Sequence, residues 1–380
     1  MKPDVELNPL NALYAHKALI SLAFQLLAVF VPVEVLRQGA PLSTALLFPL
    51  AAFLVRGLLA WPGSAAVSRL GYRRSMAAAY FLFLPAFLAL RSLELTASTV
   101  ALAAVLIGIG ESLHDIAIRS DFADLTAEQD SDSASARLHS IPKISSVVGP
   151  ILGGFLLSFY GFGLLVVVSA VLLLVAALPL LRLGRNRPEN FSFMSFASSR
   201  TKSEEDIFLQ RGIILCAGVY IFPIFVFKFV AGELEVGGVR SLGALASVAF
   251  GLAVDRVVSR YGRRKVISFG AVVSALFMFV KPHLFSTYAV FAASFVGGLA
   301  LSTYFIPLYS WMADRGRSQV PEYFGYRQML VSTGGVLLSG TAILLLDFLQ
   351  DLAVLRYSMY AAGIASVFVA VVAWLEVESD

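Results

Sequence analysis

The segment Ser68-Arg69-Leu70-Gly71-Tyr72-Arg73-Arg74 recurs 191 residues later as Ser259-Arg260-Tyr261-Gly262-Arg263-Arg264-Lys265. Both copies follow a long apolar run, and their spacing is about half of the 380-residue chain. Glycine accepts the left-handed conformation in which many helices end, so each copy predicts a very short basic turn between two helices. Duplication of one helical unit accounts for the half-chain spacing. The sequence therefore predicts two similar halves.

A second, weaker repeat lies in later apolar runs. Gly149-Pro150-Ile151-Leu152-Gly153-Gly154 is echoed by Gly335-Val336-Leu337-Leu338-Ser339-Gly340. Proline bends a helix, and small residues let helix backbones approach closely. The motif formed by Gly149, Pro150, Gly153 and Gly154 therefore predicts either a close contact between helices of the two halves or a simple packing kink.

The composition places most of this chain in a lipid bilayer. Apolar residues make up 58% of it and charged residues only 14%, with a mean hydropathy of +0.81. Soluble domains carry about 25% charged residues, so this chain has too little polar surface to be one. The net charge of +4 comes from short basic clusters between apolar runs, and we expect no nucleic-acid partner. Cys216, the single cysteine, permits no intrachain disulfide and is predicted to be a packing residue.

Hydropathy divides the chain into membrane spans, each of which needs about 20 mostly apolar residues. Suitable runs cover 12–36, 42–67, 73–91, 97–119, 139–160 and 162–182, and then 207–231, 237–258, 264–281, 285–312, 325–347 and 353–375. We therefore predict an all-α membrane protein with twelve transmembrane helices in two pseudo-symmetric six-helix bundles, residues 1–182 and 207–380. The polar segment 183–206 between them is predicted to be a cytoplasmic linker.

The basic residues predict how these spans are oriented. With twelve spans, nearly all Lys and Arg of the connections fall on one face, and the other face keeps Arg37, Arg91, Arg240, Lys281 and Arg356. Loops rich in Lys and Arg stay on the cytoplasmic side. We therefore expect both termini in the cytoplasm and the protein in a cell membrane, the inner or plasma membrane.

The two basic hairpins resemble the loop 2–3 and loop 8–9 signature of the major facilitator superfamily, Gly-x-x-x-Asp-Arg-x-Gly-Arg-Arg. Gly251-Leu252-Ala253-Val254-Asp255-Arg256 matches its first part and Arg260-Tyr261-Gly262-Arg263-Arg264 its second, with an insertion of about one helical turn between them. In the first hairpin Ser68 stands where the family usually has aspartate. The motif that begins at Gly149 resembles the superfamily's antiporter motif, although Ser145 replaces its leading glycine.

The resemblance implies secondary transporters in which two bundles rock about a central site, while the basic hairpins latch the cytoplasmic side in one state. In the first half the implied latch residues are Arg69, Gly71, Arg73, Arg74 and Asp121, and Arg69 is expected to pair with Asp121 or Asp124. In the second half they are Asp255, Arg256, Arg260, Gly262, Arg263 and Arg264.

Ionisable residues in the fourth predicted span are the first functional candidates, because charges inside a membrane are costly. Glu111, His114, Asp115 and Arg119 share one helical face at spacings of three and four. Glu111 lies ~13 Å from the cytoplasmic helix end, and Arg56 in the second span lies at comparable depth. We expect Arg56 to pair with Glu111 or Asp115, and Glu111, His114, Asp115 and Arg56 to couple transport to protons. Bracing of the latch is the alternative role for His114, Asp115 and Arg119.

Other polar and aromatic residues within spans are cavity candidates. We predict that Gln25, Tyr220, Tyr304 and Tyr309 line the substrate cavity; packing against lipid or core is the alternative for the aromatic ones. Cationic residues near span ends are expected to extend toward the membrane surface. These residues are His16, Lys17, Lys143, Lys228 and Arg240.

Together these features favour a secondary transporter of small solutes, driven by proton exchange. Because the cavity is short of charge, we favour export of an apolar or amphiphilic compound; uptake or exchange of a small anionic metabolite that meets Arg56 is the alternative. A receptor or lipid scramblase on the same scaffold is an alternative of another class. Metal-ligand spacings and phosphate loops are missing, so we expect no enzyme, no metal and no cofactor besides a proton gradient. The expected partners are the solute and the bilayer, and the expected state is a monomer.

Overall fold

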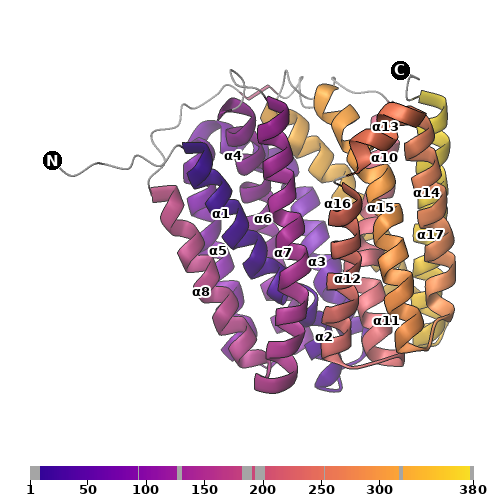
Figure 1. The fold of residues 1–380 in the computed structure, drawn as a ribbon. Helices are drawn as coiled ribbons and strands as arrows, with labels where there is room; N and C mark the ends of the chain where they lie inside the picture. Colours follow the sequence, from indigo (N-terminus) through magenta and orange to yellow (C-terminus); the bar gives the residue numbers. More distant parts are fainter. Residues whose placement is uncertain are drawn as a thin grey trace.

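The computed structural model describes residues 9–92, 94–125, 131–181, 191–192, 202–251, 253–315 and 320–376, and within these ranges all regular structure is helical. The first half contains α1 (Pro9–Leu27), α2 (Phe30–Arg37), α3 (Leu42–Leu58), α4 (Ala60–Leu70), α5 (Tyr72–Ser92), α6 (Ala97–Leu125), α7 (Ser131–Tyr160) and α8 (Phe162–Leu181). The helices run roughly parallel to one another in a single bundle-shaped molecule (Figure 1).

The second half repeats this order of long helices. It contains α10 (Lys202–Cys216), the π-helix η1 (Ala217–Ile221), α11 (Phe222–Phe229), α12 (Glu233–Gly251), α13 (Val254–Tyr261), α14 (Arg263–Val280), the short 3-10 helix η2 (Lys281–His283), α15 (Thr287–Arg315), α16 (Val320–Leu345) and α17 (Asp351–Glu376). The predicted linker 183–206 lies largely outside the described residues. Its last five residues already belong to α10, which begins at Lys202.

Most predicted spans correspond to helices that can cross a membrane. In the described part of the chain, ten helical segments are long and apolar enough to do so, and eleven if the bent pair α3–α4 counts as one span. The remaining predicted span, 237–258, falls on α12 and the first part of α13. α12 has 19 residues but carries Glu233, Glu235 and Arg240. It packs against α7 and α15, in the middle of the molecule (Figure 1). The all-α membrane fold is therefore confirmed.

The second predicted span is broken. α3 and α4 meet at Leu59 with a bend of 57°. Proline at position 62 has no N–H to donate to the carbonyl of Leu58, and its ring clashes with that carbonyl in a straight helix. The bend therefore follows from Pro62, which leaves the carbonyl of Leu58 without its usual helical partner.

Both glycine hairpins form as predicted. Gly71 between α4 and α5 has φ 86° and Gly262 between α13 and α14 has φ 81°, values that only glycine adopts without strain. Both turns lie at the same end of the molecule as the start of α1 and the end of α17 (Figure 1). We call this the hairpin end.

Helices of the two halves meet along two seams, α7 with α12 and α3 with α16. In the first seam, a Cβ placed on Gly154 would lie 2.7 Å from the carbonyl oxygen of Glu233, and Gly237 lies against the backbone of Pro150. In the second, a Cβ on Gly57 would lie 3.1 Å from Ser332, and one on Gly335 would strike the ring of Phe53. Small residues therefore set how closely the halves approach.

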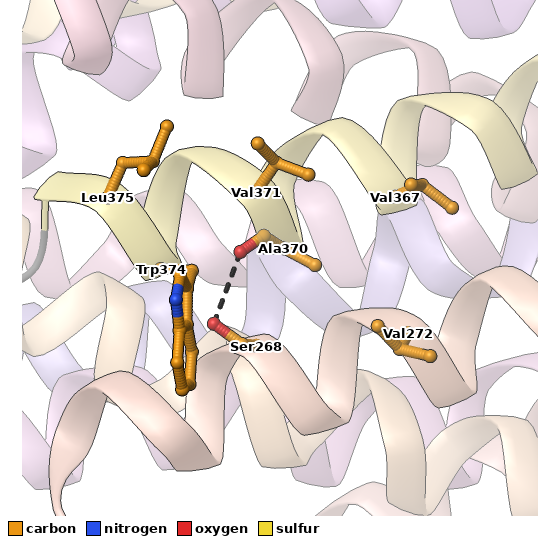
Figure 2. A pocket seen from close by; sticks show the side chains of 7 residues that line it. All are labelled: Ser268, Val272, Val367, Ala370, Val371, Trp374 and Leu375. Carbon is orange, nitrogen blue, oxygen red and sulfur yellow. Dashed lines mark hydrogen bonds between the residues drawn. The ribbon is translucent and has the colours of Figure 1, made fainter.

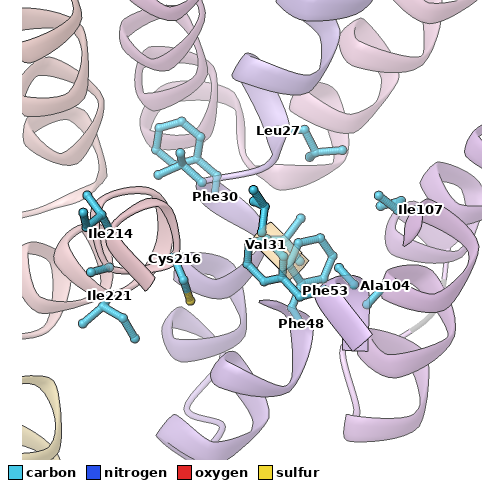
Figure 3. Packing of buried hydrophobic residues seen from close by; sticks show 14 of the residues in the cluster. Leu27, Phe30, Val31, Phe48, Phe53, Ala104, Ile107, Ile214, Cys216 and Ile221 are labelled. Atoms are coloured by element: carbon cyan, nitrogen blue, oxygen red, sulfur yellow. The ribbon is translucent and has the colours of Figure 1, made fainter. Parts of the chain in front are cut away.

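Aromatic and aliphatic side chains fill the space between the halves around these seams. Figure 3 shows Val31, Phe48 and Phe53 of the first half near Cys216 and Ile221 of the second. Cys216 is fully buried, so it is a packing residue as predicted.

Candidate functional site

The charged residues of α6 meet Arg56, which lies in the last turn of α3. Nη1 of Arg56 lies 3.2 Å from Oε2 of Glu111, and its Nη2 lies 3.4 Å from Oδ2 of Asp115. Nε of Arg119 lies 3.0 Å from the same oxygen of Asp115. The structure thus pairs Arg56 with both candidate acids, in a row of alternating charges: Arg119, Asp115, Arg56, Glu111.

The two carboxylates of this row differ in their surroundings. Asp115 contacts two arginines, whereas Glu111 contacts only Arg56 among the described residues. The Glu111 side chain is also the more accessible one, at 33% against 17%. Since each guanidinium favours the ionised form of a carboxylate, Asp115 is the better held anion. Glu111 is the group more easily neutralised by a proton.

Glu111 faces a small cavity with apolar walls. The cavity has a volume of about 20 Å³, enough for about one water molecule. Its lining comprises Phe24, Leu27, Ala28, Val31, Phe48, Ala52, Phe87, Ile107, Glu111 and Tyr220. Leu27, Val31, Phe48 and Ile107 are among the side chains drawn in Figure 3. The structure therefore brings Glu111 and Tyr220, both predicted site residues, to one cavity between the halves.

Tyr220 lies on η1, where the helix of the seventh predicted span widens into one π-turn. Its ring packs edge-on against Phe48 and Phe53 of α3, with centroids 6.2 and 6.1 Å away. Arg240 of α12 donates from Nη1 to the carbonyl oxygen of Gly218 in the same turn, at 3.0 Å. π-turns often mark functional positions in helices. Arg240 braces this one from inside the bundle and does not extend to the membrane surface, so that prediction was wrong.

His114 belongs to a second buried cluster, which the sequence did not reveal. Its Nε2 lies 2.8 Å from Nε2 of His16, and Nδ1 of His16 lies 2.7 Å from the carbonyl oxygen of Ala176. A carbonyl only accepts, so a neutral His16 donates from Nδ1 and accepts at Nε2 from His114. Tyr80 completes the cluster, with its hydroxyl 3.3 Å from Nδ1 of His16.

His16 is fully buried, which contradicts the prediction that it extends to the membrane surface. The cluster joins α1, α5, α6 and α8. It lies on the α6 turn that follows Glu111, so it fixes the helix that carries the charge row.

Polar contacts also join the halves beside Arg56. Gln328 of α16 donates from Nε2 to Oγ of Ser112 at 3.0 Å and to the carbonyl oxygen of Arg56 at 3.4 Å. Ser112 in turn donates to the carbonyl oxygen of Leu59 at the bend, at 3.1 Å. α6 and α16 therefore bond backbone carbonyls around the bend, although that of Leu59 also accepts from the N–H of Gly63 at 2.7 Å. Uncharged polar residues in apolar spans are common, so the sequence offered only the bend at Pro62 as a signal.

Two cavity predictions place residues elsewhere. Gln25 lies against Gly149: a Cβ built on Gly149 would be 2.6 Å from the Cβ of Gln25. Gln25 is not among the residues that line the cavity. Tyr304 is buried against α14 next to Gly270, where its hydroxyl bonds Ser274. Neither residue lines the cavity at Glu111, and their roles in a substrate cavity stay predictions. The side chain of Tyr309 lies outside the described part.

The first hairpin forms its ion pair through a different arginine from the one expected. Nε of Arg73 lies 3.7 Å from Oδ2 of Asp121, whereas Arg69 is exposed. α5 begins directly after the turn at Gly71, and its first turn directs Arg73 toward the end of α6. Arg73 therefore contacts Asp121. The side chain of Asp124, the alternative acid, lies outside the described residues.

In the second hairpin, the side chain of Asp255 is likewise outside the described part. Arg256 and Arg260 are exposed there, and the guanidinium of Arg264 lies 4.5 Å from the ring centroid of Trp374. The roles of both hairpins as latches stay predictions.

The glycine–proline motif is inserted between α1 and α12. Gly149 and Gly153 lie against Gln25 and Leu26 of α1, whereas Gly154 lies against α12. The N–H of Ile151, next to Pro150, donates to Oγ of Ser241 at 3.0 Å. The motif therefore contacts both its own half and the other half, and α7 remains one helix through Pro150.

No group of three or more His, Cys, Asp and Glu side chains in the described ranges is arranged to hold a metal ion.

The fold and this charged interface define a multi-pass membrane protein of the secondary-transporter type. The family model of the Major Facilitator Superfamily matches residues 17–231 and 207–380. The chain therefore belongs to the major facilitator superfamily, as the hairpins predicted. Among curated protein sequences, none matches this chain.

Solved structures share this fold at low sequence identity. A POT family transporter in complex with 5-aminolevulinic acid is 12% identical, with a TM-score of 0.76 over 95% of this chain and 94% of that one. The nucleoside transporter NupG is 13% identical, with a TM-score of 0.73 over 98% and 100%. A bacterial homologue of the iron transporter ferroportin in an inward-facing state is 16% identical, with a TM-score of 0.74 over 97% and 98%. At these identities the likeness shows the fold alone.

Proposed function

We propose that this secondary transporter exchanges protons for an apolar or amphiphilic solute, which it exports by alternating access. The observation that supports this most is the position of Glu111. It is the one carboxylate among the residues that line a nearly apolar cavity, and it ends a row of four alternating charges.

Proton uptake by Glu111 changes the balance of this row. The ionised carboxylate attracts Arg56, and protonation removes that attraction, so Arg56 is then held by Asp115 alone. Arg56 lies directly before the bend at Leu59, and its backbone carbonyl accepts from Gln328 of the other half. A change in the position of Arg56 therefore acts on a contact between the halves. This is the step by which we link proton binding to the rocking of the two bundles.

The lining favours the class of solute. Apolar side chains surround the cavity apart from Glu111 and the hydroxyl of Tyr220. An anionic solute would need a cation in the lining, but Arg56 contacts two carboxylates, and Lys17, which lies near the charge row, is not among the lining residues. We therefore favour an apolar or amphiphilic compound over a small anionic metabolite. The same proposal places the protein as a monomer in the inner or plasma membrane, with the hairpin end and both termini in the cytoplasm and no cofactor besides the proton gradient.

The test uses the purified full-length chain in proteoliposomes. A library of lipophilic cations and neutral dyes is loaded, and efflux is measured with and without an imposed pH gradient. We expect gradient-dependent flux that is lost in Glu111→Gln, and retained in the matched control Glu94→Gln, an exposed glutamate outside the helices. Gradient-dependent flux that persists in Glu111→Gln would reject this residue as the coupling group. A protein that binds solutes without flux, or that scrambles lipids regardless of pH, would instead be a receptor or scramblase.

A further inference from the structure

We propose that an open groove between α14 and α17 binds one acyl chain of an anionic phospholipid, whose phosphate pairs with Arg264. The groove has a volume of about 280 Å³ and is lined by Ser268, Val272, Val367, Ala370, Val371, Trp374 and Leu375 (Figure 2). It lies in the half of these helices nearest the hairpin end, because α14 begins there and α17 ends there.

Most of the groove lining is aliphatic or aromatic. Its one hydroxyl, on Ser268, donates to the carbonyl oxygen of Ala370 at 3.1 Å (Figure 2) and is therefore already satisfied. The volume exceeds by far the ~30 Å³ share of one water molecule, yet the indole N–H of Trp374 is the one further polar group in the lining. A hydrocarbon chain suits such a space.

The groove faces away from the other helices. Val272, Val371 and Leu375 expose 45%, 49% and 71% of their surface. In a membrane-spanning protein these side chains are in contact with lipid, so acyl chains are present at this surface at high concentration. A preference for one kind of lipid headgroup must therefore come from the positive charge at the hairpin end of the groove.

Arg264 supplies that charge. Its guanidinium stacks over the ring of Trp374, 4.5 Å from the centroid, and Trp374 lines the groove (Figure 2). Its Nε is buried without a hydrogen-bond partner, and no acidic partner of it is found in the described part of the chain. Lys265, the next residue, is exposed. A cation stacked on an indole at the membrane surface is a site for a lipid phosphate.

The first hairpin shows that this arrangement is particular to the second half. Arg73 stands two residues after Gly71, as Arg264 stands two residues after Gly262. Arg73, however, is neutralised by Asp121 of α6. The duplicated hairpin therefore keeps one arginine paired within the protein and leaves its counterpart for an external anion.

A second copy of this chain is a poorer occupant. A two-fold interface over this groove would bring Arg264 and Lys265 of both copies to the same edge. Like charges close together at the membrane surface would oppose that contact, whereas a phosphate neutralises them. The chemistry therefore favours the lipid.

The experiment measures retention of phosphatidylglycerol by the full-length protein in detergent, using native mass spectrometry and the lipid-induced rise in melting temperature. Phosphatidylcholine of the same acyl chains is the comparison lipid, and soluble glycerol phosphate tests for a site that binds phosphate alone. We expect wild type to prefer phosphatidylglycerol. In Arg264→Gln that preference should fall roughly fivefold, since one basic residue near an anionic surface contributes about 1 kcal/mol.

Two further variants separate the parts of the site. Val371→Ser makes the groove polar without changing charge and should weaken retention of both lipids, while Arg74→Gln, an exposed arginine at the same end, should change neither. Equal retention of the two lipids by wild type, or an undiminished preference in Arg264→Gln, would refute the proposal. So would an equal effect of glycerol phosphate, or a dimer that Val371→Ser abolishes. None of these readouts depends on transport, so they stand apart from the test of Glu111.

Discussion

Arg56 of α3 and Glu111 of α6 form an ion pair, 3.2 Å between Nη1 and Oε2, in which both side chains are partly exposed. The pair lies next to the bend between α3 and α4. Gln328 of the other half donates to the backbone carbonyl of Arg56 and to Ser112, the residue after Glu111. Charge state and helix packing therefore meet at one place, and the predictions below follow from that arrangement.

Removing Arg56 alone should cost more than removing it together with Glu111. Arg56→Gln leaves two carboxylates without their shared cation, and we expect a loss of about 1–3 kcal/mol, less than for a fully buried pair because both side chains are partly accessible. In Arg56→Gln/Glu111→Gln one of those acids is gone, so the apparent melting temperature should recover in part. Thermal unfolding of the four proteins in detergent checks this. A double variant no more stable than Arg56→Gln would show that the pair is not coupled.

The seam between α7 and α12 should be intolerant of a side chain at Gly154. A Cβ there would lie 2.7 Å from the carbonyl oxygen of Glu233, so Gly154→Val forces the halves apart at that end. We expect folded protein with solute flux reduced at least about tenfold, equivalent to about 1.4 kcal/mol on the barrier. Gly218→Ala is the matched control, because a Cβ at Gly218 meets nothing within 4 Å. Normal flux in Gly154→Val would mean that this seam does not set the closure.

The His16–His114 pair should stabilise the first half. In His16→Ala, the Nε2 donor of His114 and the carbonyl of Ala176 lose their partner, and a cavity opens, so we expect a loss of about 2–4 kcal/mol. His16→Ala/His114→Phe removes the orphaned donor as well and should be less destabilised than the sum of the two single variants. Apparent melting temperatures measure this coupling. Strict additivity would show that the 2.8 Å contact contributes nothing.

Gln328 should act on the exchange between conformations and not on folding. Gln328→Leu keeps the volume but removes the donor to Ser112 and to the carbonyl of Arg56. We expect a small stability change of about 1 kcal/mol, together with a shift in accessibility of cysteines introduced near Arg56 to a water-soluble maleimide. An unchanged labelling rate would contradict a gating role for this contact.

Much of the fold was predictable because the bilayer imposes it. A span must be apolar over about 20 residues, so the helices could be counted from the chain, and Gly71 and Gly262 fixed two of the turns. α12 is too polar to be counted as a membrane span by composition alone, because it carries Glu233, Glu235 and Arg240. It packs between α7 and α15. The bend at Leu59 was missed although Pro62 signalled it.

The candidate site was predicted in part. Equal depth along two helices was enough to pair Arg56 with Glu111 and Asp115, because rise per residue is constant. The position of a residue along a helix does not tell which way its side chain points around the helix axis. For that reason the sequence predicts Arg69 as the partner of Asp121, whereas Arg73 forms the pair.

The sequence by itself determined the membrane fold, its duplicated halves, the glycine turns and the costly charges of the fourth span, since each depends on composition or spacing along one helix. Only the tertiary structure decided which of these groups meet: His16 with His114, Gln328 with Ser112, Arg264 with Trp374. These contacts join residues far apart in the chain, and they depend on the rotation and approach of whole helices, which side-chain packing between the two halves sets.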